Sequence, residues 1–146
     1  MKGSRLTRRT ALAALAGALA ARNAFATTDQ AKDWLAGLAK GTPKDGKVAV
    51  KAPEIAENGN AVPLTVTVDS EMTEKSYVKA IYIAADGNPN PGVAVYEFTP
   101  ISGKAEVSLR VRLQQTQKLV AVAEMNDGTL YSGSREIKVT IGGCGG

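Results

Sequence analysis

The chain has 146 residues, a single cysteine, no histidine and a formal net charge of +4. This length suits one domain with its own hydrophobic core. Without histidine, His-based catalytic triads and general bases are excluded, and one cysteine is too few for the usual zinc, copper, haem or iron–sulfur sites. We therefore expect no metal, no other cofactor and no catalytic site of the chain's own.

The first 26 residues, "MKGSRLTRRTALAALAGALAARNAFA", are typical of an export signal. A basic start precedes an apolar Ala/Leu run over 11–21, and residues 24–26 (Ala-Phe-Ala) fit a small-x-small cleavage site. Residues 7–12 resemble the twin-arginine motif, although Ala11 stands where phenylalanine is common. We predict a twin-arginine signal peptide over 1–26 and a periplasmic mature protein. The alternative, an amphipathic anchor helix, lacks a polar face at helical period.

The positive charge of the chain belongs to this segment. It holds five basic residues and no acidic one, so residues 27–146 carry 13 basic and 14 acidic side chains, a net charge near −1. The charge of the predicted mature chain therefore does not indicate a nucleic-acid partner. The apolar run is shorter than the roughly 20 residues that span a bilayer, and we expect no membrane contact after cleavage. Because twin-arginine export moves folded proteins, we expect the chain to carry along a partner that lacks a signal.

A helix is predicted next, over about residues 28–40. Apolar side chains repeat at helical spacing on one face: Ala31, Trp34, Leu35, Leu38 and Ala39. Thr27 followed by Gln30 resembles a capping box, and Gly41 with Pro43 marks the end. We expect this helix to cover one side of the domain, with Trp34 as a packing anchor.

From about Lys47 onward the apolar period changes to two, which predicts strands. Residues 62–68, 104–113 and 135–141 alternate apolar with polar, and in the last of these the apolar face runs through to Ile141. Three other stretches are apolar on both faces, which is typical of strands inside a sheet: 76–85, 93–99 and 118–125. We expect the helix to cover part of the second apolar face and a partner subunit to cover the rest.

Turn signals separate these strands at short, regular intervals, including a hairpin signal at residues 126–128 (Asn-Asp-Gly). The fold class predicted is mainly β: an immunoglobulin-like antiparallel β-sandwich over residues 27–141, with one short N-terminal helix. The stretch from Asp86 to Glu97 has calcium-loop spacing, but Pro91 stands where that loop needs glycine, so we predict a plain turn. Arg110 and Arg112 are interpreted as a solvated strand face and not as an anion site.

The chain ends in "TIGGCGG", and this ending carries the candidate site. Cys144 lies between two pairs of glycines: Gly142, Gly143, Gly145 and Gly146. Fully extended, the stretch from Ile141 to Cys144 spans about 10 Å, enough to push a sulfur atom into another protein's cleft. No neighbouring cation or helix N-terminus lowers the pKa of the thiol, which we expect near its ordinary value of about 8.5. The cysteine is therefore predicted to be an attachment point and not a catalyst.

A lone cysteine in an exported protein also allows a second interpretation. It can form a disulfide with another chain, so the protein would be a thiol-linked structural or interaction subunit, including Cys144-linked dimers. Both interpretations remain open from composition and spacing.

Three stretches of the sequence also resemble a known protein family. The ending Gly-Gly-Cys-Gly-Gly at 142–146, the stretch "APEIAENGNAVPLTVTVDS" at 52–70 and the twin-arginine-like start resemble the SoxY family. These proteins are the sulfur-carrier subunits of the periplasmic Sox thiosulfate-oxidising system. The resemblance implies an immunoglobulin-like sandwich, and a swinging arm over 142–146 on which Cys144 holds sulfur intermediates, including a cysteine persulfide.

The same resemblance implies partners. The chain would form a heterodimer with SoxZ, which is thought to lack a signal of its own, and we expect strands 77–98 and 118–125 to form its docking surface. Thiosulfate would be joined to Cys144 by SoxAX, and sulfate would be released by SoxB. The remaining sulfur would be oxidised by SoxCD where that enzyme is present.

Overall fold

The computed structural model of the chain describes residues 26–142. Its elements in this range are α2 (Thr28–Leu38), β1 (Lys44–Asp45), β2 (Val48–Lys51), β3 (Ile55–Ala56), β4 (Val62–Val68), β5 (Val78–Ala85), β6 (Gly92–Glu97), the 3₁₀ helix η1 (Pro100–Ser102), β7 (Glu106–Val111), β8 (Gln117–Met125) and β9 (Leu130–Val139). The predicted signal peptide lies outside the described residues except for Ala26. No helix in the described range is long and apolar enough to cross a membrane.

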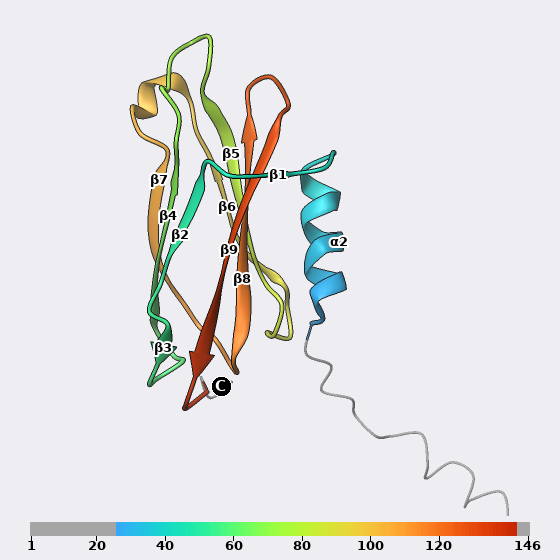
Figure 1. The fold of residues 1–146 in the computed structure, drawn as a ribbon, viewed down its shortest axis with the longest axis vertical. Coiled ribbons are helices and arrows are strands. Elements are labelled where there is room, and N and C mark those ends of the chain that lie inside the picture. The colour runs from blue at the N-terminus through green and yellow to red at the C-terminus, as the bar shows by residue number, and fades with distance from the viewer. Residues whose placement is uncertain (1–25, 143–146) are drawn as a thin grey trace, which may run out of the picture.

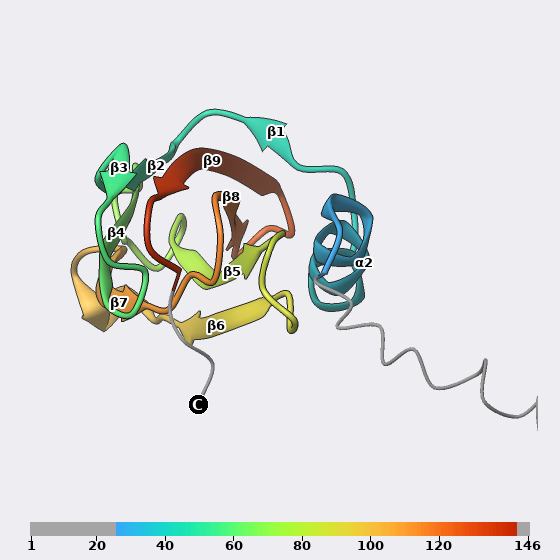
Figure 2. The same cartoon turned by 90° about the horizontal axis from the view of Figure 1, so that it is seen from below.

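The strands form two facing sheets. The larger has the order β1-β9-β8-β5-β6, with β3 also on β9, and the smaller has the order β2-β4-β7. The long strands pair antiparallel, while the two-residue strands β1 and β3 run parallel to β9. Helix α2 lies against the outer face of the larger sheet, opposite the smaller sheet (Figures 1 and 2). The predicted immunoglobulin-like sandwich with one helix is confirmed.

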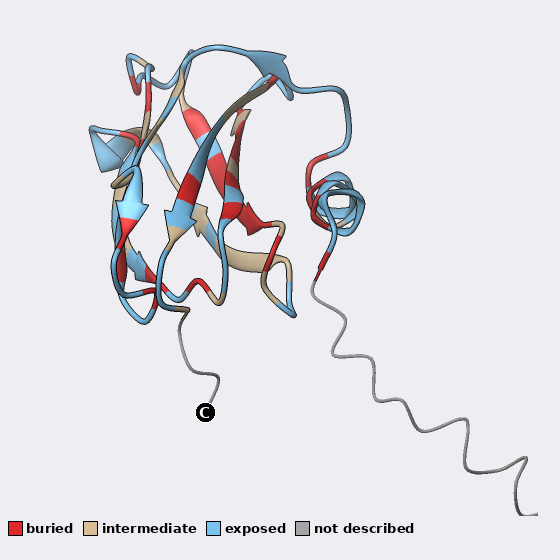
Figure 3. Cartoon of the chain, turned by 60° about the horizontal axis from the view of Figure 1, so that its bottom comes forward, coloured by how far each residue is buried: buried red, intermediate tan, exposed pale blue. Residues whose placement is uncertain are grey.

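The main core lies between the two sheets, where the period-two pattern places it. On β4 the residues Val62, Leu64, Val66 and Val68 are buried, while Pro63 between them is exposed. Ile81 and Ile83 of β5 enter the same core from the larger sheet. Figure 3 shows buried segments gathered between the sheets and on the side of α2 that faces the larger sheet.

Strand β5 is buried on both faces, as its composition predicted, because α2 covers the second face. Ala80, Tyr82 and Ala84 form a smaller apolar cluster with residues of the helix. This cluster includes Ala31 and Leu35, two positions of the predicted apolar stripe. The prediction that the helix covers part of the outer face is therefore confirmed.

Helix α2 begins where its capping box predicts. The side chain of Thr27 accepts a hydrogen bond from the backbone N–H of Gln30, and the side chain of Gln30 accepts one from the backbone N–H of Thr27. The helix ends at Leu38, two residues before the expected end, and Gly41 follows with a φ of 137° that favours glycine. The hairpin predicted at residues 126–128 is also present, between β8 and β9, with Gly128 at a φ of 87°.

Two strand expectations were wrong in detail. Strand β6, with apolar residues on both faces, lies at the edge of the larger sheet and not in its interior, and its Val95 is 45 % exposed. Strand β9 ends at Val139, so Ile141 is not part of its buried face and is 66 % exposed. Val95 is exposed because β6 has a neighbouring strand on one side only, and Ile141 is exposed because it lies beyond the end of β9.

Candidate functional site: the root of the C-terminal tail

The predicted attachment residue Cys144 and its neighbours Gly143, Gly145 and Gly146 lie outside the described residues. The structure does describe how the chain leaves the sandwich just before them. We call residues Thr140–Gly142 the arm root. It lies at the end of the sandwich where the C-terminus emerges, at the bottom of Figure 1.

Hydrogen bonds continue through the arm root after β9 has ended. The backbone N–H of Thr140 donates to the carbonyl oxygen of Ala56 at 3.1 Å. One residue later, the carbonyl oxygen of Ile141 accepts from the N–H of Gly59 at 2.8 Å. Gly59 is itself held, because its own carbonyl oxygen accepts from Leu113 at 2.8 Å. The chain is therefore fixed to the β3–β4 loop two residues beyond the last strand.

Gly142, the last described residue, lies against the β7–β8 loop. A β-carbon placed at Gly142 would overlap the carbonyl oxygen of Gln114. Its φ is not in the left-handed region, so the need for glycine here comes from close approach and not from backbone conformation. The sequence prediction gave Gly142 a role in flexibility; the structure adds that only glycine fits at this contact.

Two loops contact the arm root, β3–β4 (57–61) and β7–β8 (112–116), and a third loop, β5–β6 (86–91), is hydrogen-bonded to the β7–β8 loop. The view from below in Figure 2 shows this end of the sandwich, with the end of β9 beside the smaller sheet. Their side chains are rich in uncharged amides: Asn58, Asn60, Asn88, Asn90, Gln114 and Gln115. Such groups can both donate and accept hydrogen bonds, and the same loops also carry three charged residues, Glu57, Asp86 and Arg112.

Asn88 joins the second of these loops to the third. Its side-chain nitrogen donates to the carbonyl oxygen of Arg112 at 2.8 Å. Its side-chain oxygen accepts from the backbone N–H of Gln114 at 3.2 Å and from the side-chain nitrogen of Gln117 at 2.9 Å. The backbone oxygen of Asn88 also accepts from Ala26 at 2.7 Å, so the chain preceding α2 reaches the same point.

A shallow cavity of about 260 Å³ adjoins these residues and is lined by Asn88, Pro89, Asn90, Gly92, Arg112 and Gln114. Arg112 is exposed there, as predicted, but it lies in the β7–β8 loop and not on the strand face where the sequence placed it. Among residues 26–142, no group of three or more His, Cys, Asp or Glu side chains lies close enough together to hold a metal ion. What the described part of the site supplies is hydrogen bonds and a rigid exit for the tail.

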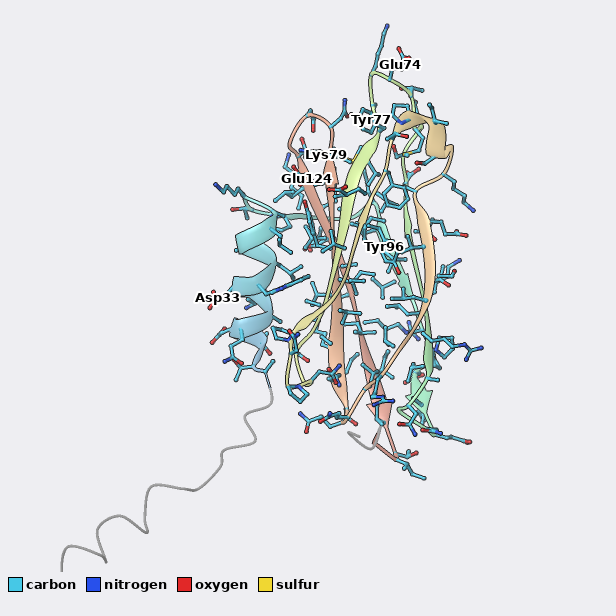
Figure 4. All side chains as sticks on the ribbon, turned by 180° about the vertical axis from the view of Figure 1, so that it is seen from behind. Asp33, Glu74, Tyr77, Lys79, Tyr96 and Glu124 are labelled. Carbon is cyan, nitrogen blue, oxygen red and sulfur yellow. The ribbon has the colours of Figure 1, made fainter. Side chains whose placement is uncertain are left out.

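The outer face of the larger sheet is the other prominent surface. An apolar groove of about 350 Å³ lies between α2 and strands β8 and β9, where Leu35 and Ala39 face Val120 and Val122. Beyond the helix, Lys79 and Glu124 point toward one another on neighbouring strands (Figure 4), with 3.6 Å between charged atoms. Glu124 also accepts a 2.7 Å hydrogen bond from the hydroxyl of Tyr82.

The pKa of Tyr82 is raised to about 12, first because burial disfavours the phenolate and second because Glu124 accepts its proton in a hydrogen bond. Lys79 lies near the start of β5 and Tyr82 near its middle, whereas the β5–β6 loop follows its end. Among the described residues, no hydrogen bond or ion pair joins this cluster to the arm root.

Comparison with known proteins decides the family. The family model for the sulfur oxidation protein SoxY matches residues 32–144, a range that reaches Cys144 itself. The chain belongs to the SoxY family. No curated protein sequence matches it closely enough to count as a relative.

Solved structures agree with this family. The sulfur carrier protein SoxY from Chlorobium limicola f thiosulfatophilum is 37 % identical, with a TM-score of 0.66 over 79 % of this chain and 100 % of that one. A superoxide reductase (neelaredoxin) from Ignicoccus hospitalis gives a TM-score of 0.57 at 22 % identity, over 79 % of this chain and 94 % of that one. A putative superoxide reductase from Thermotoga maritima gives a TM-score of 0.56 at 23 % identity, over 66 % of this chain and 93 % of that one. The likeness to the two reductases shows the fold alone.

The residues that hold the β7–β8 loop beside the arm root were not found from the sequence. Asn88 and Gln117 lie in "DGNPNPG" and "LQQTQ", which read only as turn signals. One signal was available: Gln117 occupies an inward-facing position at the start of an apolar strand, where a polar side chain needs a partner.

Proposed function

We propose that this SoxY-family chain is a sulfur carrier that holds thiosulfate-derived intermediates covalently on Cys144 and catalyses no step itself. The observation that carries the proposal is the family match, which extends over the sandwich and ends on the only cysteine in the chain. The structure supports it with a sandwich whose final strand leads into the arm root, which is held by hydrogen bonds and ends on the first glycine of the Gly-Gly-Cys-Gly-Gly sequence.

In the proposed cycle, thiosulfate and the Cys144 thiol are joined by a new S–S bond. Two electrons pass to an oxidising haem enzyme, the role of SoxAX, and the thiol proton is released. Water then cleaves the sulfur–sulfonate bond in SoxB, which releases sulfate and leaves a cysteine persulfide. SoxCD, where present, would oxidise the outer sulfur. Because each step needs a different catalyst, a tether about 10 Å long between Ile141 and Cys144 suits the task.

We also propose export to the periplasm by the twin-arginine route as a heterodimer with SoxZ. The basis is the sequence of residues 1–26 and the family resemblance. Deleting residues 1–26 should leave both proteins in the cytoplasm; a SoxZ subunit that still reached the periplasm would contradict co-export.

For the SoxZ surface we narrow the predicted region, strands 77–98 and 118–125, to the part that the fold leaves open. Strand β6 is the edge strand of the larger sheet, and Val95 on it is 45 % exposed. The central strand β8 is less available than its composition suggested, because α2 covers Val122 on its outer face. We therefore propose the β6 edge as the main part of the docking surface.

Intact-mass spectrometry of the purified heterodimer tests the carrier role. Incubation with thiosulfate and the haem enzyme should add the mass of a thiosulfonate group. The adduct should be removed by a reductant and be absent from Cys144→Ser. A homogeneous Cys144-linked dimer that does not respond to thiosulfate would instead support the alternative, a thiol-linked structural or interaction subunit.

A further inference from the structure

We infer that Asn88 is a positioning residue that sets the point and direction at which the tail bearing Cys144 leaves the sandwich. This inference rests on the carrier function proposed above, because the direction of exit matters only if visiting enzymes must reach the cysteine. Asn88 acts through the β7–β8 loop, whose Gln114 carbonyl forms the wall against which Gly142 lies.

The side chain of Asn88 satisfies both of its polar atoms within the β7–β8 segment. It donates to the Arg112 carbonyl at 2.8 Å and accepts from the Gln114 N–H at 3.2 Å, so it spans the bend between these residues. A loop with no regular ladder is held in one conformation only when its backbone groups find such partners. Removing the Asn88 amide would release two backbone groups of this loop at once.

Gln117 fixes Asn88 from the other side. It is 5 % exposed and is the buried polar side chain within the described core. Its side-chain nitrogen donates to Asn88 at 2.9 Å, and its side-chain oxygen accepts from the N–H of Gly87 at 2.9 Å. A β-carbon at Gly87 would lie 2.7 Å from that of Gln117, so these two residues are packed as tightly as their backbones allow. A buried amide with all its partners in place is rigid, since moving it would leave polar groups unpaired.

The chain of contacts therefore runs from the core to the tail. Gln117 holds Asn88, Asn88 holds the backbone of Gln114, and the Gln114 carbonyl limits where Gly142 lies. The opposite wall is the β3–β4 loop, where Gly59 donates to Ile141. Between Gly142 and Cys144 there is only one more residue, a Cα–Cα span of about 7 Å at most. A shift in the position of Gly142 therefore moves the centre of the region, about 7 Å in radius, that Cys144 can reach.

The chain offers a matched control for Asn88 at the opposite end of the sandwich. Asn126 also bridges two backbone groups, accepting from the N–H of Tyr77 at 3.1 Å and donating to the carbonyl of Lys75 at 3.1 Å. Asn126→Ala removes the same kind of bonds as Asn88→Ala but lies far along β5 and β8 from the arm root. Asn88→Asp is the conservative variant: it keeps the acceptor for Gln114 and loses the donor to Arg112.

The test measures direction and reactivity separately in the complex with SoxZ. Direction is measured as the distribution of distances between two spin labels. One label is on Cys144 and the other on a cysteine introduced by Ile101→Cys. Ile101 is 96 % exposed and lies at the far end of the sandwich. For reactivity, the Cys144 thiol is treated with iodoacetamide, a small reagent that needs no docking. In parallel, the rate of thiosulfate loading by the haem enzyme is measured.

We expect Asn88→Ala to shift and broaden the distance distribution and to lower kcat/KM for enzymatic loading roughly tenfold, with the iodoacetamide rate unchanged. Asn88→Asp should give a distance distribution and a loading rate between those of the wild type and Asn88→Ala. Asn126→Ala should match the wild type in all three measurements, even if thermal unfolding shows that it is destabilised as much as Asn88→Ala. An unchanged distance distribution in Asn88→Ala would overturn the inference. So would equal loading defects in Asn88→Ala and Asn126→Ala.

The two proposals fail in different ways. If the wild type itself gains no thiosulfate adduct, the carrier function fails, and the distance distribution still decides whether Asn88 directs the tail. If the wild type is loaded and Asn88→Ala is loaded equally fast, the carrier function stands and the positioning role is wrong. Should Asn88→Ala not fold, Asn88→Asp alone must show the shifted distances.

Discussion

The indole ring of Trp34 lies on the backbone of Gly92, with its Cε2 atom 2.6 Å from where a β-carbon of residue 92 would be. Helix α2 can approach the β6 edge this closely only because residue 92 has no side chain. The contact gives Trp34 the packing role that its place in the apolar stripe predicted.

Gly92→Ala should therefore destabilise the domain by about 1–3 kcal/mol, because a rigid ring must move aside. Trp34 is the only tryptophan, so its fluorescence during urea unfolding reports this site directly. Gly37→Ala is the matched control: nothing lies within 4 Å of the added carbon, and in a helix it should stabilise by about 0.5–1 kcal/mol. Equal stability of both variants would contradict the packing described.

Tyr82 gives the stability of the domain a pH dependence in alkaline solution. Its pKa is 10.0 in an exposed chain and about 12 in the fold. A group whose pKa is raised by folding stabilises fully below the lower value, and this contribution is lost as pH rises through the higher one. Ultraviolet absorbance of tyrosinate should show one residue titrating near pH 12, and this step should be missing in Tyr82→Phe. A Tyr82→Phe variant with the same alkaline titration would show that another tyrosine is responsible.

Truncation separates the arm root from the tail. A chain that ends after Ile141 keeps the bond from Gly59, so it should unfold at the wild-type temperature and bind SoxZ, yet gain no thiosulfate adduct. A chain that ends after Val139 also loses the bonds of Thr140 to Ala56 and should be destabilised by about 1–3 kcal/mol. Calorimetry and intact mass check both. Unfolding of the first variant would mean that the tail belongs to the fold.

Gly142→Ala tests the contact with Gln114. The added methyl group has no room against the Gln114 carbonyl, so the loop or the tail must shift. We expect faster amide hydrogen exchange at Gln114, whose N–H donates to Asn88, and at Gly59, whose N–H donates to Ile141. Protection unchanged at both amides would show that Gly142 is not confined by this wall.

Local patterns were enough to predict most of the fold. The capping box at Thr27, the alternation along β4 and the hairpin at residues 126–128 each depend on neighbours a few positions away in sequence, and all three are present. The position of β6 at an edge could not be predicted, because it depends on which strands pair. The bonds that hold the chain after β9 could not be predicted either, because the side chain of Thr140 donates to residues more than 80 positions earlier.

The candidate site likewise has a part that the sequence predicted and a part that it did not. Cys144 stood out because a lone cysteine between glycines has little structural use, so composition alone drew attention to it. Asn88 and Gln117 did not, because their partners lie between 24 and 30 residues away in other loops. An amide in a turn looks the same in sequence whether it caps its own loop or holds a neighbouring one.

The bond between Ala26 and Asn88 has a practical consequence for anyone producing the protein. It places Ala26 at the same end of the sandwich as the arm root, so an affinity tag fused ahead of the helix would crowd the space where other enzymes are proposed to approach. The β8–β9 hairpin at Asn126–Gly128 lies at the opposite pole. A short epitope inserted there would leave the working end clear, and assays of activity should be built on that version.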